Sequence, residues 1–153
     1  MMYATTGPVD AVVCVAVSGA LDDFQSLTEQ DLLDTLRGKF FGQVNLVLLG
    51  QRHLRDGGSF TLTSGVFADH PARGVTGGGV ASAALHGFVL SASLELRRGL
   101  RINAVSPGLA EDSVDTFGDR FPGLSPVPMA RLTGAYLESV EGDQSGQILR
   151  AYT

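Results

Sequence analysis

Short apolar runs alternate with longer amphipathic stretches along the chain. Residues 10–17 (DAVVCVAV) form a nearly unbroken apolar, β-branched run, which is typical of a strand buried on both faces of a parallel sheet. Residues 59–64 (SFTLTS) and 101–106 (RINAVS) predict two further strands, and residues 147–152 a last one. Residues 56–58 (DGG) predict the turn before the second strand. The pattern therefore predicts about four short strands.

Helical periodicity fills the intervals between these runs. Apolar residues at three- and four-residue steps predict a long helix over residues 28–54, with Ser26 and Glu29 at the spacing of a helix cap. The same periodicity predicts a second long helix over residues 79–98 and a shorter one over residues 129–140. Strands alternating with helices in this order predict an α/β fold whose parallel strands are joined by right-handed crossovers.

Composition narrows the classes of function. The 153 residues fit a single domain, and 44% apolar residues suffice for a core. A net charge of −5, without a run of Lys or Arg, argues against nucleic acid or a membrane as a partner. The single cysteine, Cys14, has no metal-ligand spacing around it. Without a signal-peptide pattern or an apolar run near the roughly 20 residues of a membrane helix, we expect a cytoplasmic protein without a metal.

Four phrases in order resemble one known family, the short-chain dehydrogenases/reductases. FTLTSG is similar to the family's strand that ends in a catalytic serine, and AALHGFVLSASLEL resembles the helix after its Tyr-x-x-x-Lys motif. LRINAVSPG resembles the strand and turn beside the nicotinamide, and ESVEGDQSGQILRAY resembles a final strand. The resemblance implies a partial Rossmann-like sheet, the fourth to seventh strands of seven, in a single truncated domain over residues 1–153.

Matched to that family, several functional positions carry unexpected residues. The family's tyrosine falls on Gly78 and its lysine on Ser82, so the proton donor and the amine that holds the ribose lack an occupant. The family's helix asparagine falls on Lys39, and residues 14–17 (CVAV) replace a phrase ending in glycine near the cofactor. Of the usual catalytic set, Ser64 remains. For this chain the resemblance therefore predicts neither nicotinamide binding nor hydride transfer.

The candidate site gathers at the carboxyl end of the second strand, where open α/β sheets bind ligands. The candidate catalytic residues are Ser64, His70 and Lys39, for hydrogen bonding to a carbonyl, acid–base chemistry and an amine, respectively. The alternatives are a capping serine, an exposed loop histidine and a solvated helix lysine. The candidate substrate-binding residues are Asp69, Gly78, Ser82, Pro107 and Gly108.

Three further features carry expectations of their own. The run Gly77–Gly79 leads into a helix, but no strand directly precedes it and no P-loop lysine follows, which argues against a phosphate cradle. His86, one helical turn after Ser82, is expected at a helix interface. Residues 109–127, acidic and rich in Gly and Pro, are typical of a substrate loop.

The leading functional hypothesis is a cofactor-independent isomerase, cyclase or dehydratase acting on a small carbonyl-containing metabolite. One alternative is a non-catalytic pseudoenzyme that binds a partner, and another is an NAD(P)-dependent oxidoreductase whose cofactor half comes from another chain. The first strand leaves an apolar edge exposed, which invites association. We therefore expect a homo-oligomer, dimer or tetramer, formed through this sheet edge and the two long helices.

Overall fold

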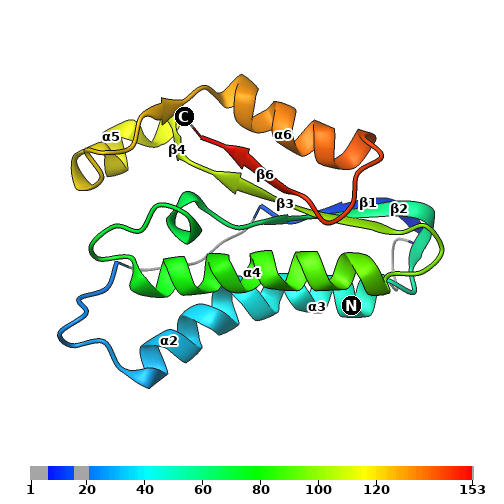
Figure 1. The fold of residues 1–153 in the computed structure, drawn as a ribbon, viewed down its shortest axis with the longest axis horizontal. Coiled ribbons are helices and arrows are strands. Elements are labelled where there is room, and N and C mark those ends of the chain that lie inside the picture. The colour runs from blue at the N-terminus through cyan, green and yellow to red at the C-terminus, as the bar shows by residue number, and fades with distance from the viewer. Residues whose placement is uncertain (1–6, 16–20, 153) are drawn as a thin grey trace.

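A four-stranded parallel sheet forms the centre of the protein (Figure 1). The computed structural model describes residues 7–15 and 21–152. The strands are β1 (Val9–Val13), β2 (Leu54–Thr63), β3 (Arg101–Pro107) and β6 (Ile148–Ala151), hydrogen-bonded in the order β1-β2-β3-β6. Every neighbouring pair is parallel. The predicted α/β class and number of strands are confirmed.

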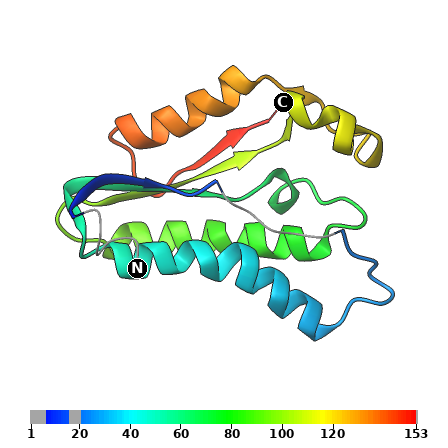
Figure 2. The same ribbon diagram turned by 180° about the vertical axis from the view of Figure 1, so that it is seen from behind.

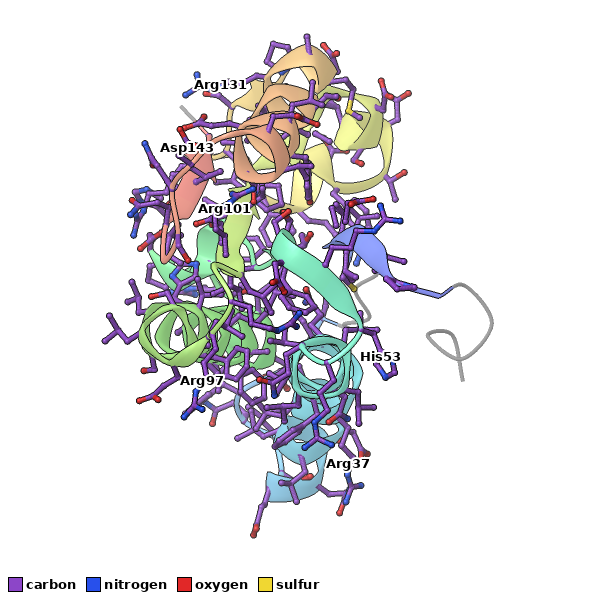
Figure 3. All side chains as sticks on the ribbon, turned by 90° about the vertical axis from the view of Figure 1, so that its right-hand side faces the viewer. Arg37, His53, Arg97, Arg101, Arg131 and Asp143 are labelled. Atoms are coloured by element: carbon purple, nitrogen blue, oxygen red, sulfur yellow. The ribbon has the colours of Figure 1, made fainter. Side chains whose placement is uncertain are left out.

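Helices cover both faces of this sheet. One long helix consists of α2 (Glu29–Thr35), a π-helical segment η1 (Leu36–Phe41) and α3 (Gly42–Gly50), and it lies beside α4 (Thr76–Glu95) below the sheet in Figures 1 and 2. Helix α6 (Met129–Glu141) covers the upper face. Figure 3, turned by 90°, shows the same three layers end on, with Arg97 after α4 and Arg131 on α6.

Short elements connect β3 to α6 where a substrate loop was expected. They are the strand pair β4 (Leu109–Ala110) and β5 (Pro126–Val127), helix α5 (Val114–Phe117), and the 3₁₀ turns η3 (Glu111–Ser113) and η4 (Gly118–Arg120). A further 3₁₀ turn, η2 (Val66–Ala68), follows β2.

Alternating residues of β2 separate an apolar face from a polar one. Phe60 and Leu62 are fully buried in the core that packs against α3 and α4. Thr61 and Thr63 face α6, where the Thr61 hydroxyl lies 2.6 Å from Ser139 Oγ and the Thr63 hydroxyl 2.7 Å from the Tyr136 hydroxyl. Buried hydroxyl groups need partners of this kind, so α6 is positioned over β2 by hydrogen bonds.

The second strand begins earlier than the sequence predicted. The long helix ends at Gly50, not at residue 54, and residues 56–58 lie within β2 as an irregularity opposite β1. A Cβ atom at Gly58 would lie 2.7 Å from the carbonyl oxygen of Asp10, and Gly57 has a φ of +78°. The two glycines were interpreted as a turn, whereas they allow an irregular strand to approach β1 closely.

The starts of both long helices also differ from the prediction. Thr28, rather than Ser26, caps α2 in a reciprocal pair with Asp31, whose carboxylate accepts from the Thr28 N–H at 2.9 Å. Helix α4 starts at Thr76, so Gly77, Gly78 and Gly79 are helical and not a loop.

Helix α4 is long and apolar enough, by length and composition, to cross a membrane. Its buried residues include Ala81, Leu85 and Val89, the last two within the main core. A core helix of a soluble protein passes the same test. The fold is compatible with the predicted cytoplasmic location, which stays a prediction.

Candidate functional site

The carboxyl end of β2 carries the serine that the sequence singled out. Ser64 is 2% exposed, and its backbone N–H donates to the carbonyl of Val105 on β3. Its hydroxyl lies 2.8 Å from His86 Nε2 on α4 and 3.4 Å from the Val105 carbonyl oxygen. Ser64 is therefore held by its neighbour strand and paired with an imidazole, which is a potential proton acceptor.

Lys39 reaches the same place from the long helix. Its Nζ atom lies 2.9 Å from Ser82 Oγ, and Ser82 is 1% exposed on α4. A Cβ atom added at Gly65 would lie 3.3 Å from Ser82 Oγ and 3.4 Å from Lys39 Nζ. The lysine, the two serines and His86 therefore converge around Ser64 and Gly65.

The π-helical segment Leu36–Phe41 is the part of the long helix that presents Lys39. Such insertions into α-helices are frequent at functional sites because they redirect side chains. Four residues later, the buried amide of Gln43 donates to the Lys39 carbonyl oxygen at 3.0 Å and to the Thr63 carbonyl oxygen at 2.8 Å. Its oxygen accepts from the Thr63 N–H at 2.7 Å. Gln43 thus fastens the helix at Lys39 to the end of β2.

Burial lowers the pKa of the Lys39 ammonium below its usual value of 10.5, because desolvation disfavours the charged form. Among the described residues no carboxylate forms an ion pair with it. Lys39 is also the single lysine of the sequence; the other ten of its eleven Lys and Arg residues are arginines. Lys39 is therefore a half-buried lysine that hydrogen-bonds a buried serine.

His86 is half-buried, and desolvation is the main cause that lowers the pKa of its imidazole. The carboxylate of Asp69 opposes this shift, whereas the charges of Arg150 and Lys39 add to it. The net effect favours a neutral imidazole near pH 7, in which one nitrogen donates and the other accepts. Interpreted from sequence as a packing residue, His86 instead contacts Ser64 directly.

Asp69 and His70 make no hydrogen bond to this cluster among the described residues, although the charge of Asp69 acts on His86. Asp69 accepts two hydrogen bonds from Arg150, Nε at 3.0 Å and Nη2 at 3.2 Å, and one from the Tyr152 hydroxyl. The ring of His70 packs edge-on against Tyr152 at 5.4 Å. Asp69 therefore binds the last strand, and its carboxylate ties down the loop after β2.

His70 lines a pocket of about 320 Å³ between the loop after β2 and the segment after η4. Arg73 and Arg120 contribute two cationic groups, and neither forms an ion pair among the described residues. The remaining lining residues are small or apolar, namely Pro71, Ala72, Phe121, Pro122, Gly123 and Leu124. The pocket suits a compact anionic group with an apolar body.

The glycine run at the start of α4 does not form a phosphate cradle. The carboxylate of Asp22 accepts from the N–H of Thr76 at 3.1 Å and from the N–H of Gly77 at 2.7 Å. A side-chain carboxylate therefore already satisfies the positive end of this helix.

The other predicted substrate-binding residues divide into two groups. A Cβ atom at Gly78 would meet only Val75 Cβ, at 4.0 Å, so there is open space at this helical position. A Cβ atom at Gly108 would lie 2.8 Å from Tyr152 Cβ, so this glycine serves packing against the last strand. Pro107 ends β3 opposite Ala151. Beside it, the buried Ser106 Oγ has no hydrogen-bond partner among the described residues.

The structure thus brings Ser64, Lys39 and Ser82 together and leaves His70 and Asp69 outside their contacts. Sequence reasoning missed His86 and Gln43 as site residues. Each stands four residues after a candidate, His86 after Ser82 and Gln43 after Lys39, a spacing that places two side chains on one helix face. An amine of lowered pKa, two hydroxyls and a neutral imidazole together can transfer protons and hydrogen-bond a carbonyl oxygen.

Comparison with known proteins supports the family resemblance. A family model described as enoyl-(acyl carrier protein) reductase matches residues 2–125. The crystal structure of the protein lin1944 from Listeria innocua is 40% identical, with a TM-score of 0.96, over 99% of this chain and 76% of that one. A search of curated proteins gave no match.

More distant structures share the fold. A small-chain dehydrogenase in complex with NADPH is 24% identical, with a TM-score of 0.85 over 97% of this chain and 74% of that one. A 3-oxoacyl-(acyl-carrier-protein) reductase from Agrobacterium tumefaciens with NADP bound is 19% identical, with a TM-score of 0.80 over 94% of this chain and 63% of that one. The chain belongs to the short-chain dehydrogenase/reductase family.

Proposed function

We propose that this site catalyses proton transfer next to the carbonyl group of a small organic substrate, without a nicotinamide. The observation that carries the proposal is the half-buried Lys39 amine, hydrogen-bonded to Ser82 close to Gly65, the residue after Ser64. The products of such a reaction are those of an isomerase, a cyclase or a dehydratase.

Each group has a defined role in the proposed reaction. The neutral amine of Lys39 accepts the proton from the carbon next to the carbonyl, and the electron pair of the broken C–H bond moves to the carbonyl oxygen. The Ser64 hydroxyl donates to that oxygen while His86, as the Nε2–H tautomer, donates to Ser64 Oγ. The Lys39 ammonium then returns the proton to the same or another carbon, or a β-substituent leaves.

The family's cofactor is a poor fit for the described residues. Two neighbours hold NADPH or NADP, and the resemblance gives the ribose and proton-donor roles to a lysine and a tyrosine. At the tyrosine position Gly78 has no hydroxyl to donate a proton. At the lysine position the Ser82 hydroxyl is already bound by Lys39. No step of the proposed reaction involves a nicotinamide.

The cationic pocket supports a substrate that carries an anionic group. Arg73, Arg120 and His70 gather there in a protein whose net charge is −5. Arginine binds carboxylate and phosphate through two parallel hydrogen bonds. The proposed substrate class is therefore a ketone or aldehyde with a carboxylate or a phosphate.

Deuterium exchange tests this function directly. The protein is incubated in D₂O with acetone, levulinate, 2-oxobutyrate and dihydroxyacetone phosphate, and proton NMR follows the loss of the C–H signals next to the carbonyl. We expect exchange above the buffer rate for at least one anionic carbonyl compound, with no requirement for NADPH. Absence of exchange with all four, or micromolar binding of NADPH in a fluorescence titration, contradicts the proposal.

A non-catalytic binding protein is the second candidate, favoured by one contact. The rings of Phe67 and Phe121 lie 4.9 Å apart and join the loop after β2 to the segment after η4. If this contact covers Ser64 permanently, the fold serves binding alone. A binding protein would then leave exchange at the buffer rate both in the parent and in Phe121→Ala, whereas the proposed enzyme shows exchange in both.

A homo-oligomer remains our proposal for the assembly. Large apolar side chains are exposed on the long helices, among them Phe41, Leu48, Leu90 and Leu94, and Val13 is 44% exposed on the edge strand β1. Exposed apolar surface of this kind favours association. We expect light scattering after size-exclusion chromatography to report at least twice the 16.0 kDa of the chain, and a mass of 16.0 kDa would exclude the assembly.

A further inference from the structure

The protein has one lysine and ten arginines, and the lysine lies in the candidate site. The single lysine of the sequence is half-buried in the candidate site, whereas arginine occupies the ten other basic positions. Arginine is permanently charged, but a lysine can lose its proton when desolvated and then becomes a nucleophile. An amine of this kind is chemically distinct from every other cation of the chain.

The surroundings of Lys39 leave its amine available for reaction. Among the described residues its side-chain partner is the neutral hydroxyl of Ser82, at 2.9 Å, and no carboxylate forms an ion pair with it. A hydroxyl stabilises an ammonium far less than a carboxylate does. The fastening of the Lys39 carbonyl by Gln43 fixes the helix that carries the amine. The amine is therefore held in place, and no carboxylate stabilises its charged, unreactive form.

We propose that Lys39 forms a Schiff base with the carbonyl carbon of the substrate, an inference that rests on the proposed function of the same site. The free amine attacks the carbonyl carbon, a C–N bond forms, and a proton passes from nitrogen to oxygen to give a carbinolamine. Loss of the hydroxyl as water, with a proton supplied by the site, leaves a protonated C=N bond. The overall change is amine plus carbonyl to imine plus water, and no oxidant or reductant is consumed.

Neighbouring groups supply what this step requires. The hydroxyl of Ser82, 2.9 Å from the amine, is close enough to hydrogen-bond the carbinolamine oxygen. His86, bonded to Ser64 Oγ at 2.8 Å, can relay the proton that converts the leaving hydroxyl into water. The open space beside Gly78 leaves room near the site for the substrate. A protonated imine also withdraws electrons from the adjacent carbon and thereby assists its loss of a proton. Because the Lys39 nitrogen is then held in the imine, the base in this covalent route is the neutral imidazole of His86, acting through Ser64.

A 1,3-diketone probe tests this inference without knowledge of the natural substrate. 2,4-Pentanedione condenses with a neutral amine to a conjugated enaminone, which absorbs in the near ultraviolet and adds the mass of the diketone minus one water. The protein at pH 7.5 should acquire this mass on the peptide that contains Lys39. We expect the modification to be faster in the folded protein than in the same chain unfolded in urea, because a lowered pKa leaves more of the Lys39 amine neutral.

Two variants and the exchange assay make the result decisive. Lys39→Arg should show no enaminone on the peptide that contains position 39, while Arg97→Gln, just after the end of α4 (Figure 3), should be modified on its Lys39 peptide as the parent is. A Lys39 peptide that is modified in urea but unmodified in the folded protein would overturn the Schiff base. If deuterium exchange persists in that case, the proposed function stands without the covalent step. If exchange is also absent, both fail.

Discussion

Replacing Lys39 with methionine should lower the rate of deuterium exchange by about 10²- to 10⁴-fold, the usual contribution of a general base or acid. Methionine preserves the length of the side chain and its apolar stem but has no amine. Because the ammonium is buried without a carboxylate, its removal should also leave the free energy of unfolding unchanged or slightly higher. A lost activity with an intact fold is the combination that distinguishes a functional lysine from a structural one.

Arg37→Met is the matched control for this variant. Arg37 lies two residues earlier in the same π-helical segment, and its pair with Asp34 is exposed to solvent. An exposed pair contributes little, so exchange and stability should both stay at the parent values. Equal loss of exchange in both variants would point to disruption of the helix and contradict a chemical role for Lys39.

Replacing Gln43 with alanine should lower the free energy of unfolding by roughly 2 to 5 kcal/mol, because two backbone groups lose their partner in the core. Gln43 is 1% exposed and satisfies both the N–H and the carbonyl of Thr63. At this point β1 no longer pairs with β2, so the amide side chain takes the place of a neighbouring strand. The same substitution frees the carbonyl of Lys39 and should reduce exchange as well.

Urea unfolding followed by circular dichroism measures this effect. Gln30→Ala serves as the control, since the Gln30 amide bonds Asp34 on the exposed face of α2 at 2.9 Å. We expect the control to remain within about 0.5 kcal/mol of the parent, as is usual at surface positions. If Gln43→Ala costs no more than Gln30→Ala, the amide does not hold the helix to the strand.

The fold could be predicted because its central strands are short runs, rich in apolar and β-branched residues, that are buried on both faces. Local sequence alone is enough to recognise a strand such as residues 101–106 and its end at Pro107 and Gly108. The four phrases of the resemblance then indicated the order of the elements. The errors arose at glycines, because the same residue type is compatible with a turn, an irregular strand or the start of a helix. Gly57 and Gly58 allow an irregular strand, and Gly77 begins a helix capped by a distant Asp22, a contact that local pattern does not contain.

The candidate site could be predicted in part. Ser64 and Lys39 were found because the resemblance places a strand end and a helix position at the same crevice. Their actual partners, His86 and Ser82, depend on how α4 packs against β2 and η1, which periodicity does not specify. The π-helical turn around Lys39 shifts the helix phase by a fraction of a turn, and so decides whether this lysine faces solvent or the site.

Titration of the single lysine tests the central claim most directly. With lysine as the only ¹³C- and ¹⁵N-labelled residue type, the protein gives one lysine side-chain signal, whose shift reports the protonation of Lys39 as the pH is raised. Because burial disfavours the ammonium, the folded chain should release this proton at a lower pH than the unfolded chain, and its stability should rise with pH between the two pKa values. A pKa clearly below 10.5 in the folded protein, returning to the usual value in urea, is the predicted result. A folded-state pKa at or above 10.5 would contradict the account of Lys39 as the reactive amine of this site.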